Sequence, residues 1–254
     1  MNLKFDIKIA EQYHSNSQKA RVMSEKWMED NMYCPCCGNS RLSKLPNNKP
    51  VADFMCKKCN EFFELKSKRG KNGKKIADGA YSTMIDRITD TANPELFVLQ
   101  YSPQYYVTDL MLIPKFFFVP DIIEKRKPLP PTARRSGWIG CNIIYSGIPE
   151  QGKILIVSNG EAADKNEIVD SYNRIKSLQV SNIESRGWLL DILNCINIIK
   201  TDEFYLNDVY EFADILQSKH PNNNNIKAKI RQQLQILRDK GFIIFLGNGH
   251  YRKI

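Results

Sequence analysis

The chain has 254 residues and carries 37 Lys and Arg against 28 Asp and Glu, a formal charge of +9 at neutral pH. Its hydrophobic content of 42% is enough for a folded core and excludes a disordered chain. No apolar run approaches the roughly 20 residues of a membrane span, and residues 1–6 alternate apolar and charged side chains, unlike a secretory signal. We therefore expect a cytoplasmic protein with no membrane partner, whose excess positive charge suits a polyanion.

Helical periodicity predicts a first helix over residues 8–32, and a cysteine pattern follows it. Two C-x2-C pairs are separated by eighteen residues: Cys34 with Cys37, and Cys56 with Cys59. This spacing is typical of a structural Zn²⁺ site with four thiolate ligands, because each short turn aims two sulfur atoms at one point. Cys36 could replace Cys34 or Cys37 as a ligand, and disulfides or reactive thiols are the alternative to metal.

Three polar residues beside the second cysteine pair predict a catalytic site. In a strand predicted over residues 61–68, Glu64 and Lys66 share one face, and Asp53 ends a strand predicted over residues 50–54. The two carboxylates, with the backbone carbonyl of Leu65, can bind Mg²⁺ through oxygen, and the arrangement predicts a site that holds the cation against a phosphodiester and cuts it. The Lys66 amine can position an attacking water or help to deprotonate it. The alternative is a surface ion pair of Glu64 with Lys66, beside an Asp53 that caps a turn.

Past this site the sequence predicts a mixed α/β pattern. Residues 66–75 contain six basic side chains, two glycines and no acid, so we expect a flexible loop, either solvated or in contact with phosphate. A helix is predicted over residues 79–90. Three further strands are predicted where β-branched and aromatic residues dominate, over residues 95–101, 107–119 and 153–158.

Residues 125–138 combine five cations, three prolines and one aromatic side chain. Beside a site that cuts phosphodiesters, Arg134 and Arg135 could bind guanine in a groove, and Trp138 could lie against a methyl group or an unstacked base. The alternative is a proline-rich loop that packs on its own domain.

The last seventy residues form a different module, with a boundary near residue 183. Helices are predicted over residues 186–199 and 206–218, and a third begins at Asn225 as its cap and runs to about Lys240. A short hairpin follows, with a turn at residues 247–249. Three helices followed by a basic hairpin predict a winged helix-turn-helix domain.

The third helix has two stripes at helical spacing. Ile226, Ile230, Leu234 and Leu237 form the stripe that we expect to be buried. The polar side chains that we expect in a major groove are Lys227, Arg231, Gln232, Gln235 and Arg238, with His250, Arg252 and Lys253 on the wing. Residues 225–254 carry seven Lys and Arg against Asp239 alone, which favours DNA, although winged helices also bind proteins.

At this point the sequence resembles a known family. Asp53 with Glu64-Leu65-Lys66 resembles the PD-(D/E)xK nuclease motif, although Ala52 and not proline precedes Asp53. The wider sequence resembles the DpnI-like family of methyl-directed restriction endonucleases. The segments that carry this resemblance are residues 15–21, 50–54, 64–68, 78–81, 131–135, 137–142, 185–188 and 230–240.

The resemblance implies a PD-(D/E)xK nuclease core with a mixed sheet and structural Zn²⁺ over residues 1–182, and a winged helix DNA-binding domain over residues 183–254. It implies a type II endonuclease that uses Mg²⁺ to cut double-stranded DNA at GATC sites containing N6-methyladenine. We expect a monomer. Two other functions stay open: a zinc-containing winged helix regulator without nuclease activity, and a nuclease with a different target.

Overall fold

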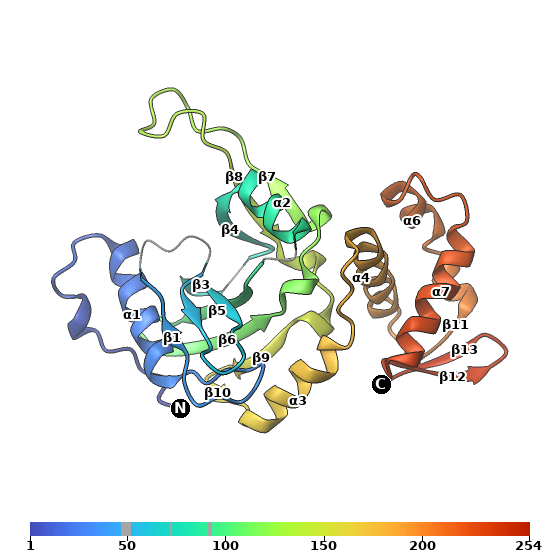
Figure 1. The fold of residues 1–254 in the computed structure, drawn as a ribbon, viewed down its shortest axis with the longest axis horizontal. Helices are drawn as coiled ribbons and strands as arrows, with labels where there is room; N and C mark the ends of the chain where they lie inside the picture. Colours follow the sequence, from blue (N-terminus) through green and yellow to red (C-terminus); the bar gives the residue numbers. More distant parts are fainter. Residues whose placement is uncertain (47–51, 72, 91–92) are drawn as a thin grey trace.

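A seven-stranded mixed sheet forms the centre of the first part of the chain (Figure 1). The computed structural model describes residues 1–46, 52–71, 73–90 and 93–254. In spatial order the strands are β1 (Ser43–Lys44), β2 (Phe54–Met55), β3 (Phe62–Arg69), β5 (Glu95–Tyr101), β6 (Val107–Ile113), β9 (Ile154–Ser158) and β10 (Glu161–Ala162). Only β3 and β5 pair in parallel among these described strands. Strand β5 is buried on both faces, which explains its almost unbroken apolar sequence.

Two helices pack on this sheet. Helix α1 (Asn16–Asn31) contacts β3 and β1, and helix α3 (Lys165–Lys176) contacts β9. The predicted helix over residues 8–32 is thus two pieces, a 3₁₀ turn η1 (Lys8–Ala10) and α1. The backbone of Ser15 is extended and marks the start of α1.

The predicted strand over residues 107–119 was too long. Strand β6 ends at Ile113, because Pro114 has no amide hydrogen to continue the ladder. The predicted strand over residues 50–54 begins outside the described residues, and β2 starts only at Phe54, directly after Asp53.

A second, three-stranded sheet lies against the first and was not predicted. Its strands in spatial order are β4 (Lys75–Ala80), β8 (Gly140–Ile144) and β7 (Ile123–Lys125). Helix α2 (Tyr81–Thr89) follows β4 directly. The predicted flexible loop over residues 66–75 was wrong at both ends, because β3 continues to Arg69 and Lys75 already belongs to β4. Ile76 is buried and pairs with Ile143, and such tertiary pairing overrides the weak strand propensity of this segment.

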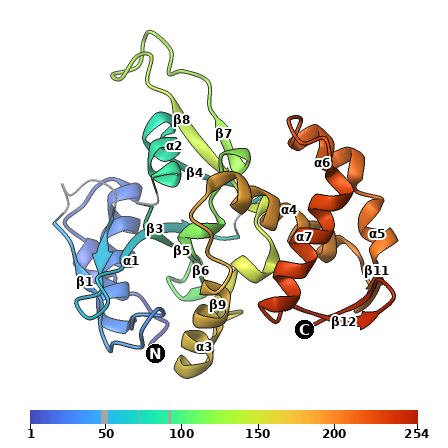
Figure 2. The same cartoon turned by 45° about the vertical axis from the view of Figure 1, so that its right-hand side comes forward.

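The connection between β7 and β8, residues 126–139, extends away from both sheets in two views (Figures 1 and 2). Backbone hydrogen bonds stiffen its stem. The amide of Arg126 donates to the Gly140 carbonyl at 3.0 Å, and the amide of Leu129 donates to the Trp138 carbonyl at 2.9 Å. Gly137 adopts a φ of 78°, which lets the chain turn back. We call residues 126–139 the projecting loop.

The C-terminal part is a helical domain with a small sheet. Its helices are α4 (Ile183–Ile198), α5 (Leu206–Tyr210), α6 (Ala213–Lys219) and α7 (Ile226–Asp239), and its strands are β11 (Glu203–Tyr205), β12 (Ile243–Gly247) and β13 (His250–Lys253). The apolar stripe of α7 is buried, as predicted. The predicted helix over residues 206–218 is instead the pair α5 and α6, and the unpredicted β11 joins the hairpin through β13. Asn225 precedes α7, but its side chain makes no capping hydrogen bond.

A buried arginine ties the two parts of the chain together. The guanidinium of Arg186, on α4, donates to the backbone carbonyls of Ile88 at 3.2 Å and Phe118 at 3.1 Å. It also donates to the carbonyls of Val180 and Ser181 just before α4. Arg186 is 4% exposed, so α4 supplies a polar group that the first part of the chain needs.

None of the helices built by the described residues has the length and apolar character needed to span a bilayer.

Replacing Arg186 with methionine should lower the free energy of unfolding by about 3 kcal/mol, because several buried carbonyls lose their donor. Equilibrium unfolding in urea measures this loss. The exposed Lys176→Ala serves as the control and should change stability by less than about 0.5 kcal/mol. A loss below about 1 kcal/mol for Arg186→Met would contradict a clamping role.

Candidate active site

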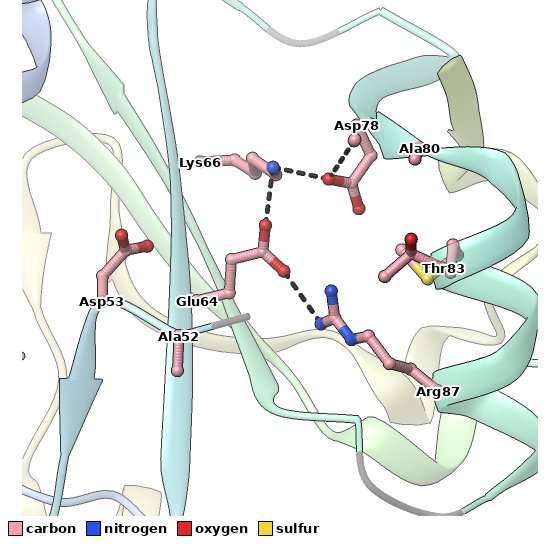
Figure 3. Close-up of a pocket in the computed structure, with 10 residues that line it drawn as sticks. Ala52, Asp53, Glu64, Lys66, Asp78, Ala80, Thr83 and Arg87 are labelled. Atoms are coloured by element: carbon pink, nitrogen blue, oxygen red, sulfur yellow. Dashed lines mark hydrogen bonds and ion pairs between the residues drawn. The ribbon is translucent and has the colours of Figure 1, made fainter. Parts of the chain in front are cut away.

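A polar pocket opens where the two sheets meet (Figure 3). Its walls come from the segment before β2, from β3, from β4 and from α2. The lining residues are Ala52, Asp53, Glu64, Lys66, Asp78, Gly79, Ala80, Thr83, Met84 and Arg87. The three residues that the sequence predicts for catalysis therefore share one pocket.

Asp53 is held in place by the sheet. Its amide donates to the Phe63 carbonyl at 2.9 Å, and its carbonyl accepts from the Leu45 amide at 2.8 Å. The hydrogen-bond ladder therefore already includes Asp53, one residue before β2 begins. Its Oδ2 accepts a hydrogen bond from the Leu65 amide at 2.7 Å. Burial raises the pKa of the Asp53 carboxyl, although the Leu65 amide opposes that shift.

The predicted Leu65 carbonyl belongs to the same edge of β3. In a strand the amide and carbonyl of one residue point the same way, and the Leu65 amide points at Asp53. Phe63 is fully buried and Leu65 is partly buried, as expected for the face opposite Glu64 and Lys66.

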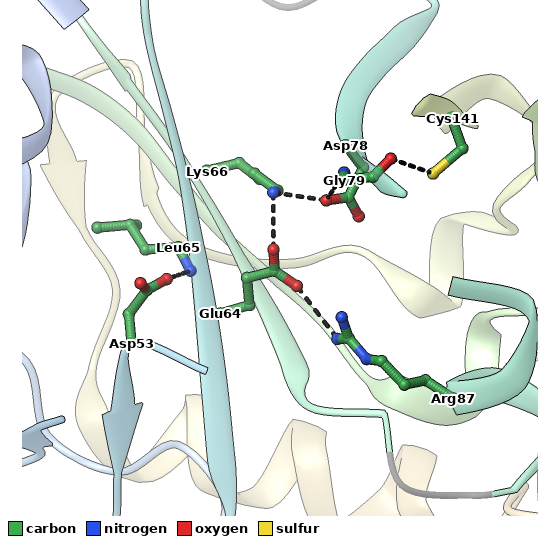
Figure 4. Close-up of polar contacts among 8 residues, drawn as sticks. All are labelled: Asp53, Glu64, Leu65, Lys66, Asp78, Gly79, Arg87 and Cys141. Atoms are coloured by element: carbon green, nitrogen blue, oxygen red, sulfur yellow. Dashed lines mark hydrogen bonds and ion pairs between the residues drawn. The ribbon is translucent and has the colours of Figure 1, made fainter. Parts of the chain in front are cut away.

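Glu64 and Lys66 form the centre of an ion-pair network (Figure 4). Lys66 Nζ lies 2.6 Å from Glu64 Oε1 and 2.6 Å from Asp78 Oδ1. Arg87 Nη2 lies 3.3 Å from Glu64 Oε2. Burial raises the pKa of Glu64, against the pull of Lys66. Burial alone would lower the pKa of Lys66, but the carboxylates of Glu64 and Asp78 outweigh it and raise that pKa.

Sequence reasoning missed three residues of this pocket: Asp78, Thr83 and Arg87. Asp78 lies in residues 78–81, a segment that carried the family resemblance but received no role. Its place on β4 depends on pairing with Cys141, sixty-three positions later, so no local pattern could find it. Arg87 lies one helical turn after Thr83 on α2, and this i, i+4 spacing was the one local signal.

The donor set of the pocket fits a hard divalent cation. Asp53 and Glu64 supply carboxylate oxygens, and the adjacent Leu65 carbonyl adds a neutral oxygen, which are the ligand types that Mg²⁺ takes in proteins. Lys66 and Arg87 place two positive groups beside them. Such a pocket can bind a phosphodiester and orient water against it.

The four predicted cysteines meet in a second cluster. Their sulfur atoms all lie within 4.8 Å of one another, with Cys34 Sγ 3.6 Å from Cys59 Sγ and Cys37 Sγ 3.6 Å from Cys56 Sγ. Four thiolates bound tetrahedrally to Zn²⁺ at about 2.3 Å would be about 3.8 Å apart, so the cluster can hold zinc.

Two equivalent turns build this cluster. The Gly38 amide donates to the Cys34 carbonyl at 2.9 Å, and the Asn60 amide donates to the Cys56 carbonyl at 2.8 Å. Gly38 and Asn60 both have a positive φ, at 71° and 60°. Burial would raise the pKa of the Cys56 thiol, but backbone amides of residues 58 and 59 outweigh it and lower that pKa to about 7. At Cys56 this favours the thiolate that a metal needs, whereas burial raises the pKa of the Cys37 and Cys59 thiols.

Cys36 lies outside the four-sulfur cluster. The group of metal-ligand atoms found among the described residues consists of the other four cysteines. The Cys36 side chain interacts with Cys34 and with Tyr172 of α3. The geometry therefore favours the two intact C-x2-C pairs over a ligand set that includes Cys36.

The DNA-binding candidates of the projecting loop lie at its tip and stem. Arg134 and Arg135 are exposed, and Trp138 is partly buried. The guanidinium carbon of Arg135 lies 4.6 Å from the centre of the Trp138 ring. Trp138 also covers Gly140, where an added Cβ would come within 2.8 Å of the indole. The indole is thus packed on its own loop, and the Arg135 guanidinium lies over its ring.

The candidates on α7 are exposed, as predicted: Lys227, Arg231, Gln232, Gln235 and Arg238. Two of them contact Tyr210 of α5. Arg231 donates to the Tyr210 hydroxyl at 2.7 Å, and Lys227 Nζ lies 5.1 Å from the centre of its ring. Arg238 is paired with Asp239 at 2.8 Å.

The wing candidates already have hydrogen-bond or ion-pair partners within the protein, which the sequence did not indicate. Glu203 of β11 pairs with His250 at 3.0 Å and with Arg252 at 2.7 Å. The Lys253 ammonium donates to the carbonyl of Ile199. The unpredicted strand β11 therefore places an acid beside two of the three wing residues.

Replacing Cys34 or Cys56 with serine should remove bound zinc, whereas Cys36→Ser should retain it at full occupancy. Metal analysis of the purified proteins measures the difference. Loss of the metal should also lower the melting temperature, since a structural zinc contributes about 10 kcal/mol or more to small modules. Loss of zinc from Cys36→Ser, with Cys34→Ser fully loaded, would contradict the four-ligand assignment.

Comparison with known protein families separates the chain into two matched regions. Residues 1–181 match the family described as DpnI: Dam-replacing family. Residues 184–253 match DpnI_C: Dam-replacing HTH domain. The first match covers the pocket and the cysteine cluster, and the second covers α7 and the hairpin. The chain therefore belongs to the DpnI, or Dam-replacing, family, as a methylation-dependent restriction endonuclease with a C-terminal helix-turn-helix domain.

Proposed function

We propose that the protein is a monomeric type II restriction endonuclease that cuts double-stranded DNA at GATC sites containing N6-methyladenine, by Mg²⁺-dependent hydrolysis. Membership in the family supports the methylated target. We propose residues 1–182 as the catalytic domain and residues 183–254 as the winged helix domain, with structural Zn²⁺ in the first.

The observation that carries this proposal is the shared pocket. Asp53, Glu64 and Lys66 come from two separate segments, yet all three side chains line one polar cavity. A winged helix regulator without nuclease activity has no use for two partly buried carboxylates beside a lysine. The pocket therefore favours hydrolysis over binding alone.

In this proposal the protein's own groups hold and orient the reactants. Asp53, Glu64 and the Leu65 carbonyl would hold Mg²⁺, which would neutralise charge on the scissile phosphate. Lys66 donates a hydrogen bond that orients the attacking water. Arg87 lies on the opposite side of Glu64 and can contact a phosphate oxygen. The Asp53–Leu65 hydrogen bond fixes one carboxylate oxygen, and the other oxygen would be available to a cation.

Reading of the methylated site needs more than one contact. One methyl group in a fitted pocket discriminates by about tenfold to two-hundredfold, so a single reader would leave frequent cuts at unmethylated sites. We propose that Trp138 on the projecting loop and the exposed face of α7 each read the site. The two readers come from separate regions, and their discrimination multiplies.

Asp53→Ala and Lys66→Ala should each lower the cleavage rate by at least about a thousandfold, because each removes a group held against the reacting phosphate. Binding of methylated duplex without Mg²⁺ should change by less than about threefold. Gel-shift titrations and single-turnover cleavage measure the two effects. The exposed Asp121→Ala is the control for lost charge. Cutting at the wild-type rate by either variant would refute the site assignment.

Trp138→Ala should reduce discrimination between methylated and unmethylated duplexes in the cleavage step, by about tenfold or more. Arg231→Ala combined with Gln235→Ala should weaken binding of methylated duplex. Full-length protein is needed for both tests, because Arg186 satisfies carbonyls of the first part of the chain. Lys200→Ala, exposed in the same domain, controls for charge. Full discrimination by Trp138→Ala would exclude the projecting loop as a reader.

A further inference from the structure

A second polar cavity lies beside helix α1, on the face of β3 opposite to the active-site pocket. Its volume is about 210 Å³. The polar side chains that line it are Asn16, Lys19, Arg69, Tyr101 and Tyr105. It shares no lining residue with the active-site pocket. The cavity is therefore a separate site on the same strand.

Contacts between regular elements hold the walls of this cavity. The Ser24 hydroxyl of α1 donates to the Ser67 hydroxyl of β3 at 3.0 Å, which fixes the helix on that face of the strand. Arg69 lies on the same face as Ser67, because side chains alternate along a strand, and it pairs with Tyr101 of β5. The Gly70 amide donates to the Tyr101 carbonyl at 2.9 Å and extends this pairing. The positions of Arg69 and Tyr101 thus follow from the sheet.

Tyr105 lines the cavity from the turn between β5 and β6. Its φ of 63° is uncommon outside glycine, and such strain persists only where surrounding contacts hold it, which often happens at binding sites. The Tyr105 amide donates to the Ser102 carbonyl at 2.9 Å, and its ring stacks on Tyr101 with the ring centres 6.3 Å apart. Burial raises the pKa of Tyr101, and Arg69 opposes that shift, so the guanidinium lies near the phenol.

The cavity carries positive charge without an acid. Lys19 and Arg69 supply two cations, and the Asn16 amide and the two tyrosine hydroxyls can donate hydrogen bonds. No carboxylate lines the cavity among the residues that the structure describes. Arg21, two residues after Lys19, has by contrast a carboxylate oxygen of Glu25 at 3.6 Å. Cations and donors with no acid beside them suit an anion.

The size and place of the cavity limit which anion it can take. Pockets for small molecules usually have about 300 Å³ or more, so this cavity suits a single phosphate group and not a whole nucleotide. Arg69 lies three residues after Lys66, which is about 10 Å further along the strand. A phosphate bound here is therefore not the phosphate that is cut. A duplex offers other phosphates at such distances, one for about every 3.4 Å of its axis on each strand.

We propose that Lys19 and Arg69 bind one phosphate of the DNA backbone in this cavity, apart from the scissile phosphate. The inference rests on the proposed function, which makes DNA the substrate. A second phosphate held on the α1 side of β3 fixes the direction of the backbone as it leaves the active-site pocket. Lys19 lies in residues 15–21, a segment that resembles the family and lines no part of that pocket. The contact gives this segment a role.

The first test is the double variant Lys19→Ala with Arg69→Ala in the full-length protein. Both side chains are at least partly exposed, so the variant should fold, which its melting temperature checks. Binding of methylated duplex is measured without Mg²⁺ at several salt concentrations. We expect the affinity to fall about tenfold at moderate salt, and the slope of log affinity against log salt to weaken by about 0.9, the value for one phosphate. Lys57→Ala with Lys176→Ala removes the same charge from exposed positions and should leave the slope unchanged.

The second test uses duplexes in which one phosphate at a time is replaced by an uncharged methylphosphonate. Wild-type protein should lose affinity about tenfold at one position other than the scissile phosphate, whereas the double variant should lose less than about twofold there, because the cations that contact it are gone. Equal losses for the two proteins at every position would overturn the proposal. So would a double variant with the wild-type salt slope.

Free phosphate is the other source of the same ligand. Calorimetric titration of inorganic phosphate into wild-type protein without DNA measures its binding. A Kd below about 1 mM that the double variant lacks, together with equal methylphosphonate losses, would assign the cavity to free phosphate and overturn the DNA contact. Weaker binding, with the methylphosphonate loss confined to wild-type protein, would support it. None of these measurements requires cleavage, so failure of the nuclease function is recognised separately, by wild-type protein that binds methylated duplex and leaves it uncut with Mg²⁺.

Discussion

The cluster of four cysteines is the constraint on which the pocket depends. Strands β1 and β2 have two residues each, too few to hold a sheet edge by their own hydrogen bonds. The Cys34–Cys59 and Cys37–Cys56 contacts fasten the segment before β1 to the turn between β2 and β3. Asp53 lies three residues before that turn's first cysteine, and Glu64 five residues after its last. Four thiolates would leave no open position on a zinc ion, so zinc bound there would stabilise the site and take no part in its chemistry.

Local patterns in the sequence were enough to predict the parts of the site that depend on spacing. The two C-x2-C pairs, the alternation that puts Glu64 and Lys66 on one face of β3, and the buried stripe of α7 all needed only neighbouring residues. The second sheet could not be predicted this way, because β4 gains its order from pairing with β8 more than sixty residues later. Asp78 and the wall opposite Lys66 depend on that pairing. The same holds for β11, whose Glu203 pairs with the wing.

Part of the positive charge that the composition suggests for DNA is already paired with acidic side chains of the protein. Several cations that the sequence assigns to DNA already have acidic partners, such as Arg252 with Glu203 and Arg238 with Asp239. These pairs are exposed and each is worth little, so a phosphate can replace the carboxylate. Lys227 and Arg231 instead lie against Tyr210, which orders them before DNA arrives. Each phosphate contact adds about −0.9 to the slope of log affinity against log salt, so the slope counts the cations that exchange partners.

Arg186 and the projecting loop bear on the proposal that two regions of the chain read the site. Arg186 fixes α4 to the first part of the chain, while residues 126–139 extend from the second sheet toward solvent. We propose that this arrangement cuts only methylated DNA, through a Mg²⁺ site at Asp53 and Glu64. The decisive experiment is digestion of one plasmid, prepared with and without adenine methylation and incubated with Mg²⁺ or a chelator. We expect fragments only from methylated plasmid with Mg²⁺, whereas equal cutting of both plasmids, or none of either, would refute the proposed function.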